Sequence, residues 1–446
     1  MKKVNNVLSL DFKREYPKVA YGKGIYMYTE DGVELIDGAS GPVLASLGHG
    51  VPEMAEVLKE QALKIAYAHR DDCTSQILED HCRMIAEMTN GDMGRIFEVC
   101  GGSEANEIAL KLVRKYHILK GTPNKYKIIG RWQSYHGMSN GALSLSGFSK
   151  RRTGYEPYLI EHGHIPPAYC YRCWFGKECG SCNLECAQAL ENEILAQGPD
   201  TVAGFIMEPV SGMSLCAATP PAGYFQEVRR ICDKYDVCLM FDEVMCGVGR
   251  TGKNFAYQHF GAAPDVITMG KALSGGYFPL AAVGITEKMY KAMDDNGGNF
   301  PPGFSWAATP LGAAVGVRAL EYLEEHNLIE QCAKRGEYLK AKLTKLMDKH
   351  PTMGDVRGMG LMIGIELVKD KSTKESFPAS AKYSSQVADE CLNQNMLIES
   401  SAGCNKGQSG DTLMIAPAFV VTEAQIDTIV ERLDNVLTIV EKKNGF

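Results

Sequence analysis

The fold is decided by the stretch Val237–Gly276, which reads VCLMFDEVMCGVGRTGKNFAYQHFGAAPDVITMGKALSGG. Val237–Phe241 is a short apolar run with the length and composition of a buried strand in a parallel sheet, and Asp265–Met269 is a second such run. The first run leads into the carboxylate of Asp242, and the second ends beside Lys271. Because ligands of open α/β sheets gather at the carboxyl ends of the strands, we expect these two side chains to share one site.

An acid and a lysine in this arrangement suit the chemistry of pyridoxal phosphate (PLP). A lysine amine forms a Schiff base with an aldehyde cofactor, and a carboxylate keeps a pyridinium nitrogen protonated. The charged ring then accepts the electrons that remain when a substrate Cα proton departs. The alternative is a surface lysine and a strand-end acid that never meet, and the two residue types alone leave it open.

Three motifs resemble, in their order and spacing, the signature of the class III aminotransferases. They are EPVSG at Glu208–Gly212, FDEVMCGVGRTG from Phe241 onward, and the DVITMGK segment that ends at Lys271. The resemblance extends over nearly the whole chain and points to the ω-aminotransferase branch of the fold-type I PLP enzymes. It implies that Lys271 carries the cofactor as an internal aldimine and that Asp242 pairs with the pyridine nitrogen.

The same resemblance implies an α/β fold: a PLP-dependent transferase of fold type I, with a large domain built on a mostly parallel sheet and a small α+β domain. We expect residues 1–60 to form an N-terminal segment that is part of the small domain. Residues 61–330 are expected to form the large PLP-binding domain, and residues 331–446 the C-terminal small domain.

Hydrophobic periodicity predicts many of the individual elements. The predicted helices are Pro52–Ala66, Ser75–Met88, Tyr224–Tyr235, Ser380–Gln394 and Thr422–Val440, and the predicted strands include Ile96–Cys100, Tyr126–Gly130, Ala203–Met207, Met396–Glu399 and Thr412–Ala416. We also expect one long helical stretch from Leu311 to His350, and Asp355–Val368 resembles the single strand that opens the small domain of the family. The Gly- and Ser-rich stretch Ser400–Asp411 is expected to be a loop near the substrate entrance.

The N-terminal segment alternates apolar and polar residues and carries the hairpin signal Asp31-Gly32. In the family it meanders and ends beside the active site. Ser40–Val43 therefore has two interpretations, as part of the substrate pocket or as scaffolding of the hairpin.

A glycine- and serine-rich turn, GGSEAN, follows the predicted strand Ile96–Cys100 and opens a helix. Such a turn binds anions because its free N–H groups and the positive end of the helix face the ligand. The alternative is that Ser103 simply caps the helix. The turn resembles the phosphate-binding turn of the family, which implies that Gly102 and Ser103 bind the PLP phosphate.

The remaining cofactor residues are also implied by the resemblance. Tyr135 of the Y-H-G triplet would stack on the pyridine ring, with His136 beside it, and Val244 would pack on the opposite face. Glu208 would contribute to the network around the site, although a solvated strand-end acid is the alternative. Ser305 stands at a threonine position that reaches the phosphate of a neighbouring subunit.

The segment around Ser305, PPGFSWAATPLGAAVG, departs from the family pattern because Thr309 stands where a histidine is usual. A serine hydroxyl still offers a donor to a phosphate. The match implies a homodimer, or a dimer of dimers, with active sites at the subunit interface.

Composition excludes several classes of protein. The chain has 446 residues, 45% of them hydrophobic and 23% charged, which suits one large globular domain and a smaller one. A net charge of −7 with no long basic block argues against a nucleic-acid partner. We find neither a run of about 18 apolar residues nor the apolar core of a secretory signal. Fifteen cysteines then suggest reduced thiols and a cytoplasmic location.

Five cysteines are concentrated in the segment Ala168–Ala187. Cys170, Cys173, Cys179, Cys182 and Cys186 could bind zinc or an iron–sulfur cluster, remain as thiols or form disulfides. The spacing of the two C-x-x-C pairs is shorter than in a zinc ribbon. Catalysis by PLP requires no metal, so the reaction that we expect needs none of these.

The expected reaction is a ping-pong transfer of an amino group from an amine or ω-amino acid to a 2-keto acid of the pyruvate or 2-oxoglutarate class. Many relatives bind the acceptor carboxylate with an arginine before their A-P-P-like motif, but no arginine lies between Met396 and Phe419. Arg70, Arg131 and Lys406 are possible substitutes. Racemases, epimerases and aminomutases of the same fold, and a PLP-binding protein without catalysis, are the alternative functions.

Overall fold

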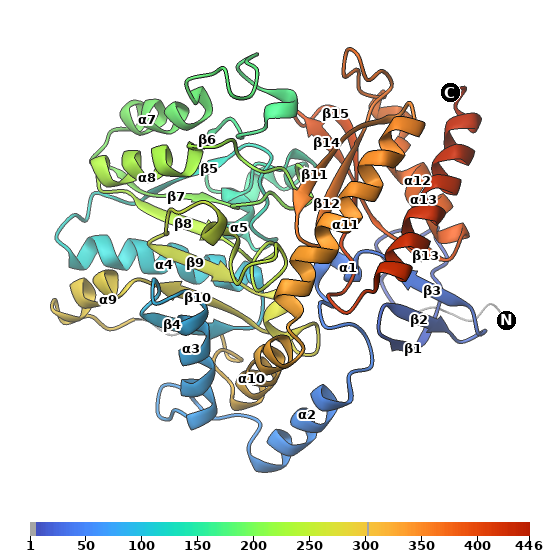
Figure 1. Cartoon of the computed structure of the whole chain (residues 1–446). Helices are drawn as coiled ribbons and strands as arrows, with labels where there is room; N and C mark the ends of the chain where they lie inside the picture. The colour runs from blue at the N-terminus through green and yellow to red at the C-terminus, as the bar shows by residue number, and fades with distance from the viewer. Residues whose placement is uncertain (1–5, 301–302) are drawn as a thin grey trace.

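The computed structural model describes residues 6–300 and 303–446, which form three β-sheets covered by helices (Figure 1). The largest sheet lies at the centre of one half of the molecule, and the other two sheets lie with the C-terminal helices in the other half. None of the helices in the described ranges combines the length and the apolar character needed to cross a lipid bilayer.

The central sheet has seven strands in the order β4-β10-β9-β8-β7-β5-β6. Strands β6, β5, β7, β8 and β9 are parallel neighbours, whereas β10 runs antiparallel to β4 and β9. The strands are β4 (Arg95–Val99), β5 (Lys127–Arg131), β6 (Gly163–Ile165), β7 (Val202–Met207), β8 (Cys238–Asp242), β9 (Val266–Met269) and β10 (Ala281–Ile285). The prediction of a mostly parallel sheet is therefore confirmed.

Both faces of this sheet are buried, which explains the continuous apolar runs in its strands. Along β8, Leu239 and Phe241 face the core under α7 (Glu185–Gln197) and α8 (Tyr224–Tyr235). Cys238 and Met240 alternate with them and face the core under α4 (Gly102–Leu119) and α9 (Glu287–Asp294). Figure 1 shows these two pairs of helices on opposite sides of the sheet.

The remaining helices cover the edges of the central sheet or pack in the other half of the molecule. They are α1 (Ser40–Val43), α2 (Pro52–Lys64), α3 (Gln76–Met88), α5 (Asn140–Leu145), α6 (Ser149–Arg152), α10 (Pro310–Glu325), α11 (Leu328–Lys349), α12 (Tyr383–Asn393) and α13 (Glu423–Lys443). The expected single helical stretch from Leu311 to His350 is wrong in one respect. It breaks between α10 and α11, because Asn327 adopts a left-handed conformation with φ of 47°.

The second sheet has the order β11-β12-β15-β14 and is antiparallel throughout. Its strands are β11 (Met353–Met359), β12 (Met362–Leu367), β14 (Glu399–Asn405) and β15 (Ser409–Ile415). Two predictions are corrected here. Asp355–Val368 holds parts of two strands joined by a tight turn at Gly360, and Ser400–Asp411 is a strand hairpin rather than a loop. Its small residues had suggested a loop, but Ser400, Ser401 and Ala402 pair with β15, and the register then shifts between Ala402 and Asn405.

The third sheet joins the two ends of the chain. Strands β1 (Val19–Lys23), β2 (Tyr26–Thr29) and β3 (Glu34–Asp37) form an antiparallel meander with the predicted turn at Asp31-Gly32. The short strand β13 (Met396–Leu397) adds to β3 in parallel. This pairing supports our proposal that the N-terminal segment belongs with the C-terminal domain.

One buried arginine fastens three parts of the chain together. The Arg250 guanidinium donates to the carbonyl oxygens of Leu361 at 3.0 Å and Pro417 at 2.7 Å, and to Ser46 Oγ at 2.9 Å. It also lies over the ring of Phe419, 4.4 Å from the centroid. Arg250 is fully buried, and this burial lowers its pKa to about 10 because the charge is removed from water without a carboxylate partner.

We expect Arg250→Met to lower the free energy of unfolding by about 3 kcal/mol, because buried carbonyls lose their donor. The change is read from urea unfolding followed by circular dichroism. Arg83→Met is the control, since Arg83 is on an exposed helix face and pairs only with Asp80 and Glu87. Equal unfolding midpoints for the two variants would show that the Arg250 contacts do not hold the three segments together.

Candidate active site

The site lies at the edge of the central sheet where β4, β8 and β9 end. Asp242 is the last residue of β8, and Lys271 begins a short 3₁₀ helix, Lys271–Ser274, two residues after β9. Gly102, the first residue of α4, follows β4 at the same edge. The Val244 side chain lies between the turns at Gly102 and Gly270. A Cβ added to Gly102 would lie 2.6 Å from Val244 Cγ1, and a Cβ added to Gly270 would lie 3.5 Å from it.

Asp242 is buried, with 4% of its surface exposed, and its carboxylate accepts three hydrogen bonds. Oδ2 accepts from Asn106 Nδ2 at 2.9 Å and from His136 Nδ1 at 2.8 Å, and Oδ1 accepts from the Val244 N–H at 3.0 Å. No lysine or arginine in the described ranges forms an ion pair with it. The arrangement therefore suits a carboxylate that receives a cationic N–H from a bound ring.

Asn106 is a site residue that the sequence analysis quoted but did not assign. Its Nδ2 also donates to the His136 carbonyl at 2.7 Å, and its Oδ1 accepts from Thr268 Oγ1 at 3.0 Å. One amide thus links α4, β9, Asp242 and the His136 segment. The only signal in the sequence was a polar residue at the start of a predicted helix, next to its apolar stripe, and the full burial that gives Asn106 its importance is seen only in the structure.

Glu243, the second carboxylate of the DE pair, does not enter the site. It is fully buried and accepts from the backbone N–H groups of Ala256 at 2.6 Å and Tyr257 at 2.7 Å. Burial raises the pKa of Glu243 to about 8, although the two backbone donors act in the opposite direction. Adjacent carboxylates at one strand end therefore have different roles, because alternate side chains of a strand point to opposite faces.

The Lys271 side chain is half-buried, and its Nζ donates to the Pro42 carbonyl at 2.7 Å. The residue adopts a left-handed conformation with φ of 48°, which is unfavourable for a side chain of this type. Burial lowers the pKa of Lys271 to about 8, while the nearby carboxylates of Asp242 and Glu399 oppose this shift. An amine with this pKa is available as a nucleophile or base near neutral pH.

The predicted phosphate turn forms the start of α4, but Ser103 does not cap the helix. The N-cap is Gly101, and no side chain caps the helix there. Ser103 is the second helical residue, and its Oγ accepts the Met138 N–H at 3.1 Å. The alternative of Ser103 as the cap is therefore wrong. The backbone N–H groups of Gly102 and Ser103 have no acceptor among the described residues, as expected for the first turn of a helix that is open to an anion.

Glu208 and Arg131 fix the segment that carries Tyr135 and His136. Arg131 Nη2 donates to the Glu208 carbonyl at 2.7 Å and to its Oε2 at 3.0 Å, and Glu208 Oε1 accepts the Tyr135 N–H at 3.0 Å. All of Glu208 except 5% is buried, so the alternative of a solvated strand-end acid is wrong. Because the Arg131 guanidinium is buried and already donates to Glu208, Arg131 is not a candidate for binding a substrate carboxylate.

The other two candidates for carboxylate binding are also engaged away from Lys271. Arg70 lies over the Phe97 ring at 5.3 Å, and the Lys406 amine lies 5.8 Å from the centroid of the Trp174 ring. No contact joins either of them to Asp242 or Lys271 within the described part of the chain.

Ser305 lies apart from the other predicted residues. It occupies an exposed turn, and no hydrogen bond joins its side chain to a described residue of the site. Thr309, four residues later, caps α10 by accepting the Gly312 N–H at 3.2 Å. At the position where the family usually has a histidine, Thr309 therefore stabilises the start of α10.

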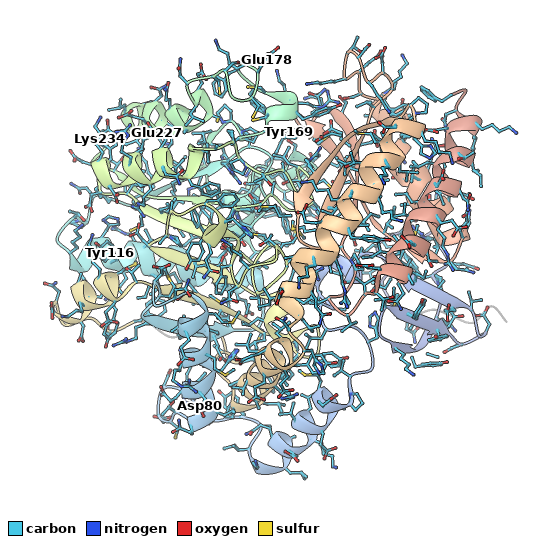
Figure 2. The ribbon with its side chains drawn as sticks, viewed as in Figure 1. Asp80, Tyr116, Tyr169, Glu178, Glu227 and Lys234 are labelled. Atoms are coloured by element: carbon cyan, nitrogen blue, oxygen red, sulfur yellow. The ribbon has the colours of Figure 1, made fainter. Side chains whose placement is uncertain are left out.

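The cysteine-rich loop lies away from this site. Its five cysteines line a small cavity together with the buried Tyr169 and with Glu178, which Figure 2 labels at the edge of the molecule. All five are free thiols. Burial and neighbouring thiols, above all Cys179, raise the pKa of Cys170 to about 12. Among the described residues no three His, Cys, Asp or Glu side chains are grouped so as to hold a metal ion.

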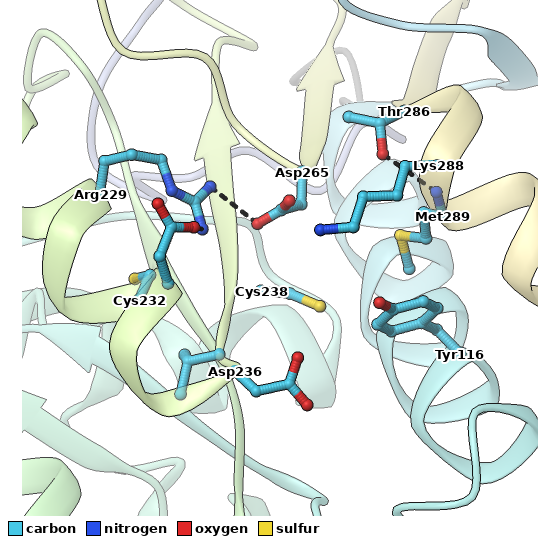
Figure 3. Close-up of a pocket in the computed structure, with 11 residues that line it drawn as sticks. Tyr116, Arg229, Cys232, Asp236, Cys238, Asp265, Thr286, Lys288 and Met289 are labelled. Carbon is cyan, nitrogen blue, oxygen red and sulfur yellow. Dashed lines mark hydrogen bonds and ion pairs between the residues drawn. The ribbon is translucent and has the colours of Figure 1, made fainter.

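A second cavity, of about 70 Å³, lies at the opposite edge of the central sheet (Figure 3). Val237 and Asp265 line it just before β8 and β9 begin, and Arg229 Nη1 donates to Asp265 Oδ2 at 2.8 Å. Its position at the amino ends of the strands separates it from Asp242.

These residues fit PLP on four grounds. Asp242 is a buried carboxylate without a cationic partner, α4 presents a free N-terminus, and the Lys271 amine stands at the same edge. In addition, His136 Nε2 is a buried polar atom without a partner among the described residues.

Comparisons with known proteins agree with this geometry. The family model of the class III aminotransferases matches residues 13–437. The taurine–pyruvate aminotransferase of Bilophila wadsworthia is 35% identical, covering 95% of this chain and 92% of its own. The diaminobutyrate–2-oxoglutarate transaminase of Halomonas elongata is 33% identical, covering 93% and 88%.

Solved structures give the same result. A transaminase obtained by ancestral reconstruction superposes with a TM-score of 0.91 at 34% identity, covering 96% of this chain and 93% of its own. The ω-transaminase of Pseudomonas jessenii in complex with PMP superposes with a TM-score of 0.90 at 30% identity, covering 96% and 94%.

We expect the uptake of PLP by the apoprotein to follow the titration of Lys271. Because burial lowers its pKa to about 8, the neutral, nucleophilic fraction rises through pH 8 rather than near the ordinary value of about 10.4. The initial rate should therefore increase about tenfold per pH unit below pH 7 and level off above about pH 9. Stopped-flow absorbance measures the rate, and the reaction of PLP with a blocked lysine, whose amine keeps the ordinary pKa, is the reference that should still rise between pH 9 and pH 10. A rate for the protein that also rises between pH 9 and pH 10 would contradict the lowered pKa.

Proposed function

The chain belongs to the class III aminotransferases, which are PLP-dependent transaminases, and we propose that it transfers an amino group from an amine or ω-amino acid to a 2-keto acid. The acceptor would be of the pyruvate or 2-oxoglutarate class, and the mechanism ping-pong. The observation that carries the proposal is that a Lys271 amine of lowered pKa stands at the same strand ends as a buried Asp242 carboxylate that has no lysine or arginine partner among the described residues.

When bound, PLP supplies an aldehyde that condenses with amines and a ring that accepts the electron pair left by a departing Cα proton. Asp242 would hold the proton on the ring nitrogen, supported by Asn106 and His136 on its Oδ2. Gly102 and Ser103 would receive the phosphate at the start of α4. Among the described residues, Asp242 has no lysine or arginine partner, and the backbone N–H groups of Gly102 and Ser103 have no acceptor.

Lys271 would act twice. As the nucleophile, it would attach the cofactor through its Nζ. As a free amine, it would remove the proton from the substrate carbon, since a pKa of about 8 places it close to working pH. Tyr135 and Val244 would pack on the two faces of the ring and orient the bond that breaks. Tyr135 is fixed for this by the Glu208 carboxylate, which accepts its N–H.

The names of two relatives support the choice of acceptor. One is named for transfer to pyruvate and the other for transfer to 2-oxoglutarate. Both acceptors are 2-keto acids, and we propose one of this class for the present chain.

The position of Ser305 supports a homodimer or dimer of dimers with shared sites. Its hydroxyl lies in an exposed turn without a hydrogen bond to any described residue of the site in its own chain, so we propose that it serves the phosphate of a second chain. A monomer in sedimentation analysis that transaminates at the full rate would contradict this. We also propose a cytoplasmic location, in keeping with the fifteen cysteines. Oxidised cysteines in protein taken directly from cells would oppose it.

The proposal is tested by following the absorbance of the bound cofactor. Addition of an amine donor should shift the spectrum, and addition of pyruvate or 2-oxoglutarate should restore it, with one carbonyl product released per turnover. Lys271→Ala should retain neither covalently attached cofactor nor the cycle. If a donor exchanges its Cα proton for solvent deuterium without any spectral cycle, the protein is a racemase or a related enzyme instead.

We expect Asp242→Asn to lower kcat/KM by about 10²- to 10³-fold, because charge that develops on the ring loses its counter-charge. Asp236→Asn is the matched control, since Asp236 lies at an exposed helix end and pairs with Lys120. Steady-state kinetics with equal cofactor loading decides the matter. A similar loss in both variants would remove Asp242 from its proposed role.

A further inference from the structure

A cavity of about 300 Å³ lies beside the segment that the Lys271 amine contacts, although Lys271 is not among its lining residues. Its wall includes Pro42, whose carbonyl accepts the Lys271 Nζ hydrogen bond at 2.7 Å. This volume is at the lower limit of small-molecule sites. Glu399 lines the cavity, and its charge and that of Lys271 act on each other, so we take the cavity as the space into which a small substrate would extend. Ser40 and Gly41 also line it, in keeping with the interpretation of Ser40–Val43 as part of the substrate pocket.

The charged groups in this cavity are mainly acidic. Asp37, His49 and Glu399 line it, and none of its described lining residues is a lysine or an arginine. The other lining residues are apolar or contribute small side chains. A substrate that carries a negative tail would meet two carboxylates here.

Asp37 is occupied by its own surroundings. Its Oδ2 lies 3.0 Å from His49 Nε2, and its Oδ1 accepts the N–H groups of Gly41 at 3.1 Å and Ala39 at 3.4 Å. Only 3% of its surface is exposed. These bonds fix the turn that carries Pro42, so Asp37 shapes the cavity and has little left to offer a ligand.

Glu399 differs because its carboxylate has neither a hydrogen bond nor an ion pair with any described residue. Burial raises the pKa of Glu399, and the positive charges of Lys271 and Arg151 oppose that shift. A half-buried carboxylate without a partner is unfavourable, and such groups are commonly completed by a ligand.

The backbone around Glu399 is fixed, so the residue stays in the wall of the cavity. Glu399 opens β14 and pairs with Met414 of β15. Gln133 Nε2 donates to the Gly403 carbonyl at 2.8 Å and to the Cys404 carbonyl at 2.5 Å, which fastens β14 to the segment that leads to Tyr135.

We propose that Glu399 is a binding subsite for the second, cationic group of the donor, so that the preferred donor is a small diamine or diamino acid. This inference rests on the proposed transaminase function and narrows its donor class. With one amine of the donor at Lys271, the second ammonium lies along the cavity and donates to the Glu399 carboxylate. Charge-assisted bonds of this kind add both affinity and selectivity.

Arg151 offers a competing explanation for Glu399. Arg151 belongs to α6, and its guanidinium has no hydrogen bond or ion pair within the described ranges, although its charge acts on both Glu399 and Tyr135. Glu399 could then serve to position Arg151 for the carboxylate of the keto acid. The two explanations differ in which substrate responds when the charge of Glu399 is removed.

The test compares three donors with four-carbon chains: 1,4-diaminobutane, butylamine and 4-aminobutyrate. The wild-type holoenzyme should prefer the diamine. Glu399→Gln should lower kcat/KM for the diamine by about 10- to 100-fold, mainly through KM, because a charge-assisted bond is lost. It should change butylamine by less than about twofold, and Glu399→Asp should retain part of the preference. Glu324→Gln, which removes an exposed carboxylate from α10, is the control and should change nothing.

Three results would overturn the assignment. If wild type and Glu399→Gln use butylamine and the diamine equally well, the subsite does not exist. If Glu399→Gln raises the KM for pyruvate and leaves the diamine unchanged, Glu399 positions Arg151 instead. If 4-aminobutyrate is the preferred donor of the wild type, the cavity accepts anions. In each case amines are still transaminated, whereas the absence of any spectral cycle with every amine would contradict the proposed function itself.

Discussion

The structure depends on burying the negative charge of Asp242 without a permanent cation. A carboxylate removed from water is costly unless donors surround it. Here the donors come from Asn106 on α4, His136 on the segment after β5, and the Val244 N–H after β8. Three elements far apart in the chain must therefore converge at one strand end, and that convergence also brings the N-terminus of α4 to the same edge as Lys271. The need to surround the Asp242 carboxylate with donors therefore accounts both for the site and for the convergence of these elements.

Arginines in this chain show how strongly surroundings decide a role. Arg131 is buried against the Glu208 carboxylate, and Arg250 is buried among backbone carbonyls. Arg151 has no such partner within the described residues. These three residues carry the same guanidinium group. Only the positions of the neighbouring oxygen atoms distinguish a structural clamp from a group that is available to a substrate.

Much of the central sheet was predictable because its strands are buried on both faces and read as apolar runs. The strand β8 and the helix α8 lie within a residue of their predicted bounds. The hairpin β14–β15 was not predictable, because its Gly and Ser residues are small enough to pair closely but also suit a loop. Asn106 and Glu399 were missed for a related reason. Their importance follows from contacts, or from the lack of them, with residues far away in the chain.

The parallel pairing of β3 with β13 has a consequence for how the protein is made. Ser40 Oγ donates to the Ala416 carbonyl, a partner 376 residues later, so the segment that carries Pro42 cannot settle until nearly the whole chain has left the ribosome. The segment around Ser40 is thus among the last to be placed, and contacts this distant in the chain slow folding. A nascent chain that stops before β15 lacks Ala416, so Ser40 in the wall of the cavity cannot form this hydrogen bond. The wall of the proposed substrate cavity is therefore completed late in synthesis.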